Sequence, residues 1–225
     1  MLRRRDTIRE VEIKLRVQDV PALVSRLRRL GAKPRGRVLE QNTLYDTPDF
    51  DLRRDGRLLR LRVESPAASR RIPAGKERRI LTSKSPPSPG AGHSPRASRY
   101  KERLEREAII HGPHGWPDVL LSIGLRPSFR YEKYRTSFRL RGLHLDLDET
   151  PIGTFLELEG PPRAINRIAK ALGHSKSDYI RDTYWELYVK DCQQRGRAPR
   201  HMLFQEQESC KLHTLRLTNS RSPFN

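Results

Sequence analysis

The sequence predicts an α+β fold in which a closed antiparallel β-barrel of about eight strands carries helices on its outer surface. Three observations predict it: short segments that alternate ionic with apolar residues, a few amphipathic helical segments between them, and a polar face made almost only of charged side chains. The chain has 225 residues and a mass of 26.2 kDa. It is therefore long enough to bury a core without metal or disulfide cross-links.

The alternation begins in residues 10–15, where Glu10, Glu12 and Lys14 point one way and apolar residues the other, because successive strand side chains lie on opposite faces. The pattern returns in residues 58–63, 101–107, 131–139, 143–148 and 155–159. With Lys84, the ionic side gathers eight acids (Glu10, Glu12, Glu105, Glu107, Asp146, Asp148, Glu157, Glu159) and nine bases (Lys14, Arg60, Arg62, Lys84, Lys101, Arg103, Lys133, Arg135, Arg139).

One such strand alone is typical of an ordinary sheet with one solvated face. Solvated faces, however, normally mix Thr, Ser, Asn and Gln with the charges, and these strands do not. A barrel of about eight strands encloses room for one small ligand. We therefore expect the charged faces to line a water-filled tunnel, where charges must be paired, hydrated or bound to metal and ligand.

Four helices are expected around these strands. The first begins after Asp19, with Pro21 in its first turn, and ends at Gly31. The others are a short helix within residues 117–123, a helix over 163–172 that Gly173 ends, and a helix over 178–190 that Ser177 caps. Trp116 and Trp185 are expected in the cores of such helices.

The net charge is strongly positive, since 46 Lys and Arg against 27 Asp and Glu give 46 − 27 = +19. This excess favours a polyanionic partner, whether nucleic acid, an acidic membrane surface or a phosphate-rich small molecule. Much of it lies outside the predicted strands, in residues 65–99, a largely Pro-, Ser- and Gly-rich loop region, and in residues 191–225, which we expect to be a poorly ordered basic tail. Residues 1–190 are expected to form the tunnel domain.

Several classes of protein are disfavoured. The N-terminus has no apolar stretch after its arginines, and no window is apolar enough to span a bilayer. Cys192 and Cys210 give neither a disulfide framework nor a cysteine zinc site, and the histidines show no metal spacing. We therefore expect a reduced, cytoplasmic protein with no membrane partner.

Taken in order, the motifs resemble those of the CYTH superfamily, the triphosphate tunnel metalloenzymes. The sequence Glu10-x-Glu12-x-Lys14 is similar to the family's opening strand. It is followed by residues 45–48 (YDTP), 52–62 (LRRDGRLLRLR), 81–84 (LTSK), 103–107 (RxExE), 133–135 (KxR), 147–148 (LD) and 153–159 (GTFLELE). The resemblance covers roughly residues 8–190 and implies a closed eight-stranded tunnel, as the alternation does. Class IV adenylate cyclases, thiamine triphosphatases and inorganic triphosphatases belong to this superfamily.

The resemblance implies a divalent cation, Mg²⁺ or Mn²⁺, held by carboxylate oxygen, and a triphosphate held by cations. The expected metal ligands are Glu10, Glu12, Asp146, Asp148, Glu157 and Glu159, each of which has a tunnel salt bridge as its alternative role. The expected substrate-binding residues are Lys14, Arg60, Arg62, Lys84, Arg103, Lys133 and Arg135. Glu105 or Glu107 is expected to orient water or a second ion. Arg53, Arg54, Arg57 and Arg139 are expected at the surface.

Three functions remain open from sequence. The first is a metal-dependent triphosphatase acting on an inorganic, thiamine or nucleoside triphosphate. The second is a class IV adenylate cyclase that makes cyclic AMP and pyrophosphate from ATP, although residues 3–7 (RRRDT) lack the His-Phe that such cyclases often carry before the first motif. The third is a non-catalytic module binding polyphosphate or RNA, which is disfavoured because residues 65–99 contain no aromatic side chain. Homodimer formation is left open.

Overall fold

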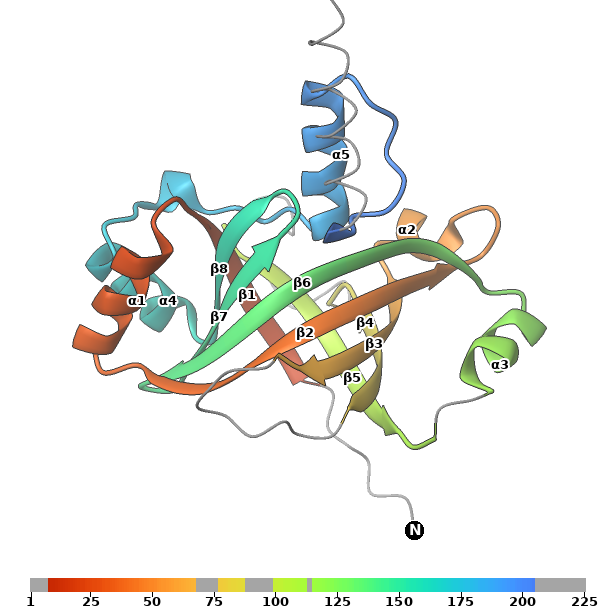
Figure 1. Cartoon of the computed structure of the whole chain (residues 1–225), viewed down its shortest axis with the longest axis horizontal. Coiled ribbons are helices and arrows are strands. Elements are labelled where there is room, and N and C mark those ends of the chain that lie inside the picture. Colours follow the sequence, from red (N-terminus) through yellow and green to blue (C-terminus); the bar gives the residue numbers. More distant parts are fainter. Residues whose placement is uncertain (1–7, 68–76, 88–98, 113–114, 205–225) are drawn as a thin grey trace, which may run out of the picture.

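The computed structural model describes residues 8–67, 77–87, 99–112 and 115–204. Within these ranges eight antiparallel strands close into a barrel in the order β1-β5-β4-β3-β2-β6-β7-β8 (Figure 1), which confirms the predicted fold class. The strands are β1 (Ile8–Val17), β2 (Lys33–Asp46), β3 (Leu58–Pro66), β4 (Arg78–Ser85), β5 (Lys101–Ile110), β6 (Arg126–Leu140), β7 (Leu143–Thr150) and β8 (Gly153–Glu159).

The helices lie outside this barrel, between or after the strands. They are α1 (Val20–Arg29), α2 (Asp51–Arg54), α3 (Trp116–Ser122), α4 (Pro162–Ala171), a 3₁₀ turn (Lys176–Asp178) and α5 (Tyr184–Gln194). The predicted limits of α1, α3 and α4 are each within a residue or two of those observed. Asp19 caps α1 by accepting a hydrogen bond from Ala22 N at 2.9 Å. Gly31 and Gly173 follow α1 and α4 with left-handed φ of 87° and 88°.

The expected start of the last helix is wrong. Residues 179–183 do not continue the 3₁₀ turn, and α5 begins only at Tyr184. Its cap is Thr183 instead of Ser177: the Thr183 hydroxyl accepts from Glu186 N, and the Glu186 carboxylate accepts from Thr183 N at 2.6 Å. The intervening Ile180 pairs with Lys14 of β1 through two backbone hydrogen bonds of 2.9 Å.

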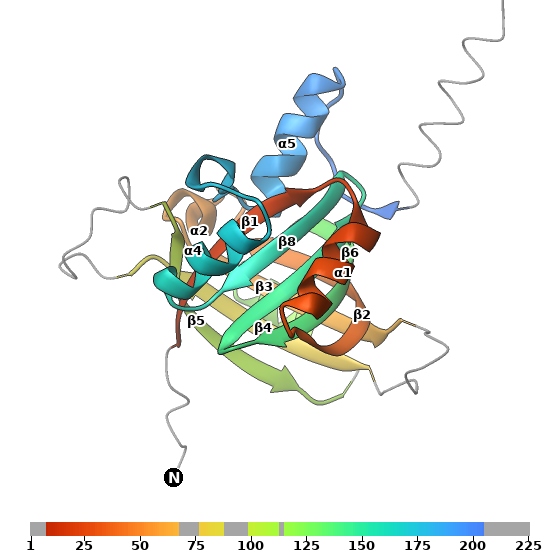
Figure 2. The same cartoon turned by 90° about the vertical axis from the view of Figure 1, so that its left-hand side faces the viewer.

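The main hydrophobic core lies between the outer face of the barrel and two helices. Leucines and isoleucines of β1, β6, β7 and β8 point outward and pack under α1 and α4, with Ile13, Leu27 and Ile165 fully buried. The two helices lie side by side on this wall (Figures 1 and 2), where Arg26 donates to the carbonyl of Leu172. Because the apolar residues of the strands face outward here, their ionic neighbours face inward.

A second, aromatic core joins α5 to the barrel, and α5 stands over the strands in Figure 1. It contains Phe129, Phe155 and Tyr188, together with Met202 from the segment after α5. Met202 is fully buried, and its backbone pairs with that of β6. Its carbonyl accepts a hydrogen bond from Glu132 N, and its N–H donates one to the carbonyl of Arg130. This covers part of β6 that lies beyond its pairing with β7.

The division between domain and tail thus differs from the expected one at residue 190, because residues 191–204 belong to α5 and its docking segment. The rest of the predicted tail, residues 205–225, lies outside the described residues, as do residues 68–76 and 88–98 of the predicted loop region. No helix among the described residues is long and apolar enough to cross a membrane.

Candidate active site in the barrel lumen

The inward faces of the strands surround a cavity of about 650 Å³, within the size range of small-molecule sites. Every site residue predicted from the sequence lines it except Asp148, which is fully buried and bonded to its neighbours. The lining residues from that set are Glu10, Glu12, Lys14, Arg60, Arg62, Lys84, Arg103, Glu105, Glu107, Lys133, Arg135, Asp146, Glu157 and Glu159. The alternation therefore brings these groups together as expected.

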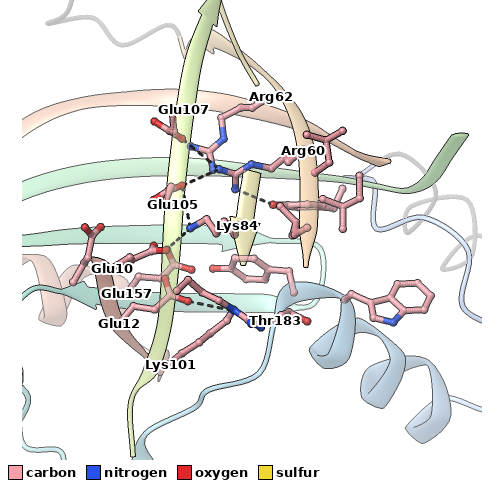
Figure 3. Close-up of a pocket in the computed structure, with 18 of the residues that line it drawn as sticks. Glu10, Glu12, Arg60, Arg62, Lys84, Lys101, Glu105, Glu107, Glu157 and Thr183 are labelled. Carbon is pink, nitrogen blue, oxygen red and sulfur yellow. Dashed lines mark hydrogen bonds and ion pairs between the residues drawn. The ribbon is translucent and has the colours of Figure 1, made fainter. Parts of the chain in front are cut away.

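Strand register explains how acids meet bases across the lumen. In the β1–β5 ladder Glu12 lies opposite Lys101, and in the β1–β8 ladder Lys14 lies opposite Glu157. The resulting ion pairs measure 3.3 Å for Glu12–Lys101 and 3.3 Å for Lys14–Glu157. Lys84 of β4 reaches Glu10 at 2.5 Å, a contact drawn in Figure 3. Pairing of this kind offsets the cost of burying these charges.

The acids on β7 and β8 are held by Arg135. Its guanidinium contacts Asp146 at 2.8 Å, Asp148 at 2.7 Å and Glu157 at 2.6 Å. Asp148 also accepts from Lys133 at 2.7 Å and from the Tyr184 hydroxyl at 2.7 Å. Three of the six predicted metal ligands are thus already compensated by cations of the protein.

Two acids, Glu10 on β1 and Glu159 on β8, are less well compensated. Burial raises the pKa of Glu10 to about 7, with a further contribution from the charge of Glu12. Burial also raises the pKa of Glu159, with the charges of Glu105 and Glu12 adding to it. By contrast, although burial opposes it, Lys14 and Lys101 hold the pKa of Glu12 well below its usual range. Repulsion among acids therefore concentrates where β1, β5 and β8 meet.

The remaining cations lie on β3, β4 and β5. Arg60 is buried and lies 3.7 Å from Glu107 and 4.0 Å from Glu105, above Lys84 in Figure 3. Lys84 lies 3.2 Å from Glu105. Arg103 donates to the backbone carbonyl of Gly56 at 2.9 Å and so ties β5 to the turn before β3. Arg60 and Lys84 thus have acid partners that an anionic ligand can replace.

The predicted metal ligands do not form a ready coordination shell: within the described ranges no three His, Cys, Asp or Glu residues are gathered as around a metal ion. The donor chemistry nevertheless fits a hard divalent cation, since Glu10, Glu12 and Glu159 offer only carboxylate oxygens. Glu12 lies opposite Glu159 in the ladder. A cation among these three would relieve the repulsion that raises the pKa of Glu10 and Glu159.

Comparison with known proteins agrees with this geometry. The pattern that defines the CYTH domain matches residues 9–184. The chain belongs to the CYTH family. A Methanocaldococcus jannaschii protein named "Putative adenylate cyclase" is 26% identical over 189 residues, covering 79% of this chain and 97% of that protein. In CYTH terms, the lumen described above is the triphosphate tunnel.

Solved structures share the CYTH fold with this chain. A protein from Pyrococcus horikoshii superposes with a TM-score of 0.64 at 22% identity, covering 81% of this chain and 99% of that one. A structure titled as a "putative adenylate cyclase" from Vibrio parahaemolyticus gives a TM-score of 0.62 at 21% identity, covering 81% of this chain and 98% of that one. At these identities the likeness shows the architecture of the CYTH barrel.

One buried acid of the CYTH tunnel was missed from sequence. Glu40 of β2 is fully buried and contacts Arg62 at 2.9 Å, Lys133 at 3.4 Å and Arg135 at 3.5 Å. These three cations hold its pKa below the usual range although burial alone would raise it. Its neighbour Asn42 accepts from Arg62 at 3.1 Å. The positions two residues to either side of Glu40, Val38 and Asn42, are uncharged, so the ionic alternation did not reveal it.

The Tyr-Asp-Thr-Pro sequence at residues 45–48 has a structural role that the alternation could not reveal. Asp46 is buried at the end of β2 and accepts backbone hydrogen bonds from Thr47, Leu52 and Arg53. It therefore fixes α2 against the mouth of the tunnel. As a result Arg53, expected at the surface, is partly buried and lines the cavity, whereas Arg54 is exposed as expected.

The structure also tests where the sequence placed the two tryptophans and two further arginines. Trp185 lines the cavity in addition to packing edge-on against Phe129, so its assignment as a helix core residue was incomplete. Trp116 is 38% exposed and is not a core residue. Arg139 and Arg57 are exposed at the rim, as expected.

Proposed function

We propose that this CYTH protein is a divalent-metal-dependent hydrolase that cleaves a phosphoanhydride bond of a triphosphate. The observation that carries the proposal is the cavity itself, the lumen of a closed barrel lined by both carboxylates and basic side chains. A triphosphate complexed with a divalent cation presents the complementary charges: negative oxygens for the bases and a positive ion for the acids.

Glu10, Glu12 and Glu159 would hold the metal, Mg²⁺ or Mn²⁺. A bound divalent cation neutralises charge on phosphate oxygens and lowers the pKa of coordinated water. Asp146, Asp148 and Glu157 were predicted as ligands too, but their ion pairs with Arg135, Lys133 and Lys14 favour another role. They hold these cations in fixed positions along the tunnel.

The cations would bind the phosphate chain. Arg60, Lys84 and Arg103 approach the lumen from β3, β4 and β5, opposite the Arg135 cluster. Charge-assisted hydrogen bonds from guanidinium and ammonium groups are strongest where water is excluded. Arg62, Lys133, Arg135 and Lys14 complete the set, each positioned by a buried acid.

Water attack on a terminal phosphorus requires an acceptor that orients the nucleophile. Glu105 and Glu107 lie on β5 beside Arg60, and Glu107 accepts from the Thr82 hydroxyl at 2.9 Å. Both carboxylates line the cavity on the side of the proposed cradle. We assign this orienting role to the pair, with Glu105 nearer to Lys84.

The proposal is tested by a product assay on the purified full chain with Mg²⁺ or Mn²⁺. Tripolyphosphate, thiamine triphosphate and ATP are supplied separately, and phosphorus NMR identifies the products. We expect release of orthophosphate from at least one substrate, with turnover lowered at least about a hundredfold in Glu10→Gln and Glu12→Gln, as expected when a metal ligand is lost.

Glu102→Gln is the matched control, because Glu102 lies on β5 but pairs with Arg9 outside the cavity lining. Its turnover is expected to stay within about twofold of the parent. Absence of turnover for all three substrates would remove the hydrolase proposal. Equal turnover in the Glu10 and Glu12 variants would remove the assigned metal site.

A class IV adenylate cyclase is the second candidate, favoured by the printed names of the Methanocaldococcus and Vibrio proteins. The same tunnel would then direct the ribose 3′ hydroxyl of ATP to the α-phosphorus. The assay separates the two activities, since cyclic AMP with pyrophosphate would identify the cyclase and orthophosphate the hydrolase.

A further inference from the structure

The outer surface of α1 and α4 carries bases and no acids. Both helices cover the same wall of the barrel, on the side that faces the viewer in Figure 2. Their buried residues, Leu27 and Ile165 among them, pack on the strands. Their six bases are exposed to solvent instead: Arg26, Arg28 and Arg29 on α1, and Arg163, Arg167 and Lys170 on α4. We call these six residues the basic helix face.

The lack of acids extends beyond the two helices. The chain has 27 Asp and Glu, yet none of them lies in residues 20–39 or 160–177, which contain α1 and α4. Within the described part of the chain, none of the six bases forms an ion pair. Arg26 donates to the carbonyl of Leu172 at 3.1 Å and so joins the two helices. The positive charge of this surface is therefore left without a counter-charge from the described chain.

Exposed bases on α5 are arranged differently. Arg195 pairs with Asp191 at 2.9 Å, and Lys190 pairs with Asp182 at 2.6 Å. Such mixing of the two signs of charge is usual on solvated surfaces. A surface with one sign of charge instead attracts ligands of the opposite sign. The basic helix face is therefore a candidate interaction surface for a polyanion.

The arrangement of bases on α4 is unfavourable for the unbound protein. Arg163 and Arg167 are four residues apart and Lys170 follows three residues later, so these like charges are neighbours along one side of the helix. Arg163 also lies in the first turn, where the helix dipole disfavours positive charge and no acid is present. A polyanion bound along α4 would relieve both effects.

The composition of the face selects among polyanions. Neither helix contains an aromatic residue, so the nucleobases of a single strand would find no ring to stack on. Neither helix exposes a large apolar side chain that could enter a membrane interface; among the described residues such side chains are exposed elsewhere, as Val119 and Leu121 are on α3.

The length and rigidity of the face favour a stiff partner. Each helix has 10 residues and therefore spans about 15 Å, which exceeds a single phosphate group. A duplex presents closely spaced phosphates on a rod that stays straight over about 150 base pairs. It therefore loses less conformational freedom on binding than a flexible polyphosphate chain does.

We propose that the basic helix face binds the phosphate backbone of a double-stranded nucleic acid, independently of its sequence. Five of the six bases are arginines, whose guanidinium groups can donate two parallel hydrogen bonds to one phosphate. Contacts to the backbone alone carry no sequence information. The proposal does not depend on the proposed hydrolase, because none of the six residues lines the lumen.

The test measures binding of the full chain to duplex DNA and, separately, to duplex RNA by fluorescence anisotropy between about 50 and 200 mM salt. The duplexes end in 5′ hydroxyl groups, so no triphosphate is offered to the tunnel. The variant Arg163→Gln/Arg167→Gln/Lys170→Gln removes three charges and keeps good helix formers. At the lowest salt its affinity is expected to fall at least about tenfold. The slope of log affinity against log salt is expected to decrease by about 2–3, since each phosphate contact contributes about 0.9.

The matched control, Arg54→Gln/Lys190→Gln/Arg195→Gln, removes the same charge from exposed bases outside the face. Its affinity for either duplex is expected to stay within about threefold of the parent, so that position and not net charge explains the loss. Thermal unfolding without ligand checks folding: the α4 variant should unfold at or above the temperature of the parent, because repulsion on α4 is removed.

The proposal fails if the parent binds neither duplex, if the α4 variant binds like the parent, or if the control loses as much affinity as the α4 variant. Phosphatidylserine vesicles and inorganic polyphosphate, titrated in the same buffer, are expected to bind more weakly than the duplexes. Tighter binding of either one that the α4 variant loses would overturn the assignment to nucleic acid. Turnover of tripolyphosphate by the α4 variant should match the parent within about twofold, since these charges lie outside the lumen.

Discussion

At the scale of single residues, the tunnel depends on a buried acid that contacts no solvent. Glu40 partly neutralises the positive charges of three cations, Arg62, Lys133 and Arg135. Neither of its carboxylate oxygens has a hydrogen bond of good geometry. Its contribution is therefore mainly Coulombic. In a site of low dielectric, removing that charge leaves the cations repelling one another.

Glu40→Gln keeps the shape of the side chain and removes its charge. We expect the free energy of unfolding to fall by about 3–5 kcal/mol, the usual cost of removing one partner of a buried ion pair. Urea denaturation followed by far-ultraviolet circular dichroism measures it. Glu102→Gln, whose partner Arg9 is half exposed, should cost below about 1 kcal/mol. A Glu40 variant as stable as that control would contradict the assignment.

The alternation of charged and apolar residues predicted some of the lumen side chains and missed others. Alternation placed Glu10, Arg60 and Asp146 in the lumen correctly, because a strand fixes the direction of every second side chain. It missed Glu40, whose nearest neighbours on the same face of the strand, Val38 and Asn42, are uncharged, and it missed Arg53 and Trp185, which lie on helices. It also could not show which acids pair with Arg135, since that depends on register between β6, β7 and β8.

At the scale of elements, α5 controls one end of the lumen. Its first residues line the cavity, and Tyr184 reaches Asp148 from there. The Tyr184 ring also lies under two lysines, 5.3 Å from Lys14 Nζ and 4.8 Å from Lys133 Nζ. Tyr184 is the first residue of α5, so the residue at which the helix begins decides where the Tyr184 ring lies in the tunnel.

Thr183→Ala removes the cap of α5 and should lower the free energy of unfolding by about 1 kcal/mol. Ser177→Ala tests the cap that the sequence pattern favoured, and Ser177 is exposed with its hydroxyl bonded only to Ser175 within the described chain. That variant is expected to unfold like the parent in the same urea titration. A larger loss for Ser177→Ala than for Thr183→Ala would mean that the helix starts earlier in solution.

The error in the start of α5 has a local cause. Ser175 and Asp178 form a capping box of their own, but it caps only a 3₁₀ turn that ends at Asp178. The chain then extends so that Ile180 can pair with Lys14 of β1. Tertiary pairing thus keeps residues 179–183 out of the helix that the amphipathic pattern predicts, and periodicity alone cannot anticipate this.

At the scale of the whole molecule, the positive charge and the tunnel are separate properties. The chain carries a net +19, yet Glu10, Asp148 and Glu157 each have a basic partner within the lumen. Closure of the barrel was predictable, because segregated ionic faces on so many strands require an enclosed site. Paired charges in the lumen have a consequence for ligands: an anion alone or a cation alone would disturb the existing ion pairs.

We therefore expect Mg²⁺ and tripolyphosphate to stabilise the folded protein cooperatively. Tripolyphosphate alone places negative charge beside Glu105 and Glu107, and Mg²⁺ alone places positive charge beside Lys84 and Lys101, whereas together they compensate each other. The gain in stability with both ligands should exceed the sum of the separate gains by about 1–3 kcal/mol, as in typical coupled binding.

Thermal unfolding measures this coupling in four samples: no ligand, each ligand alone, and both. Sulfate at equal ionic strength controls for anions that bind the basic exterior, because screening acts on exposed charges more than on buried ones. In Glu12→Gln the coupling should fall, since an assigned metal ligand is missing while the cradle cations remain. Strictly additive shifts in the parent protein would show that the two ligands bind independently, and the metal and the phosphate would then not share this lumen.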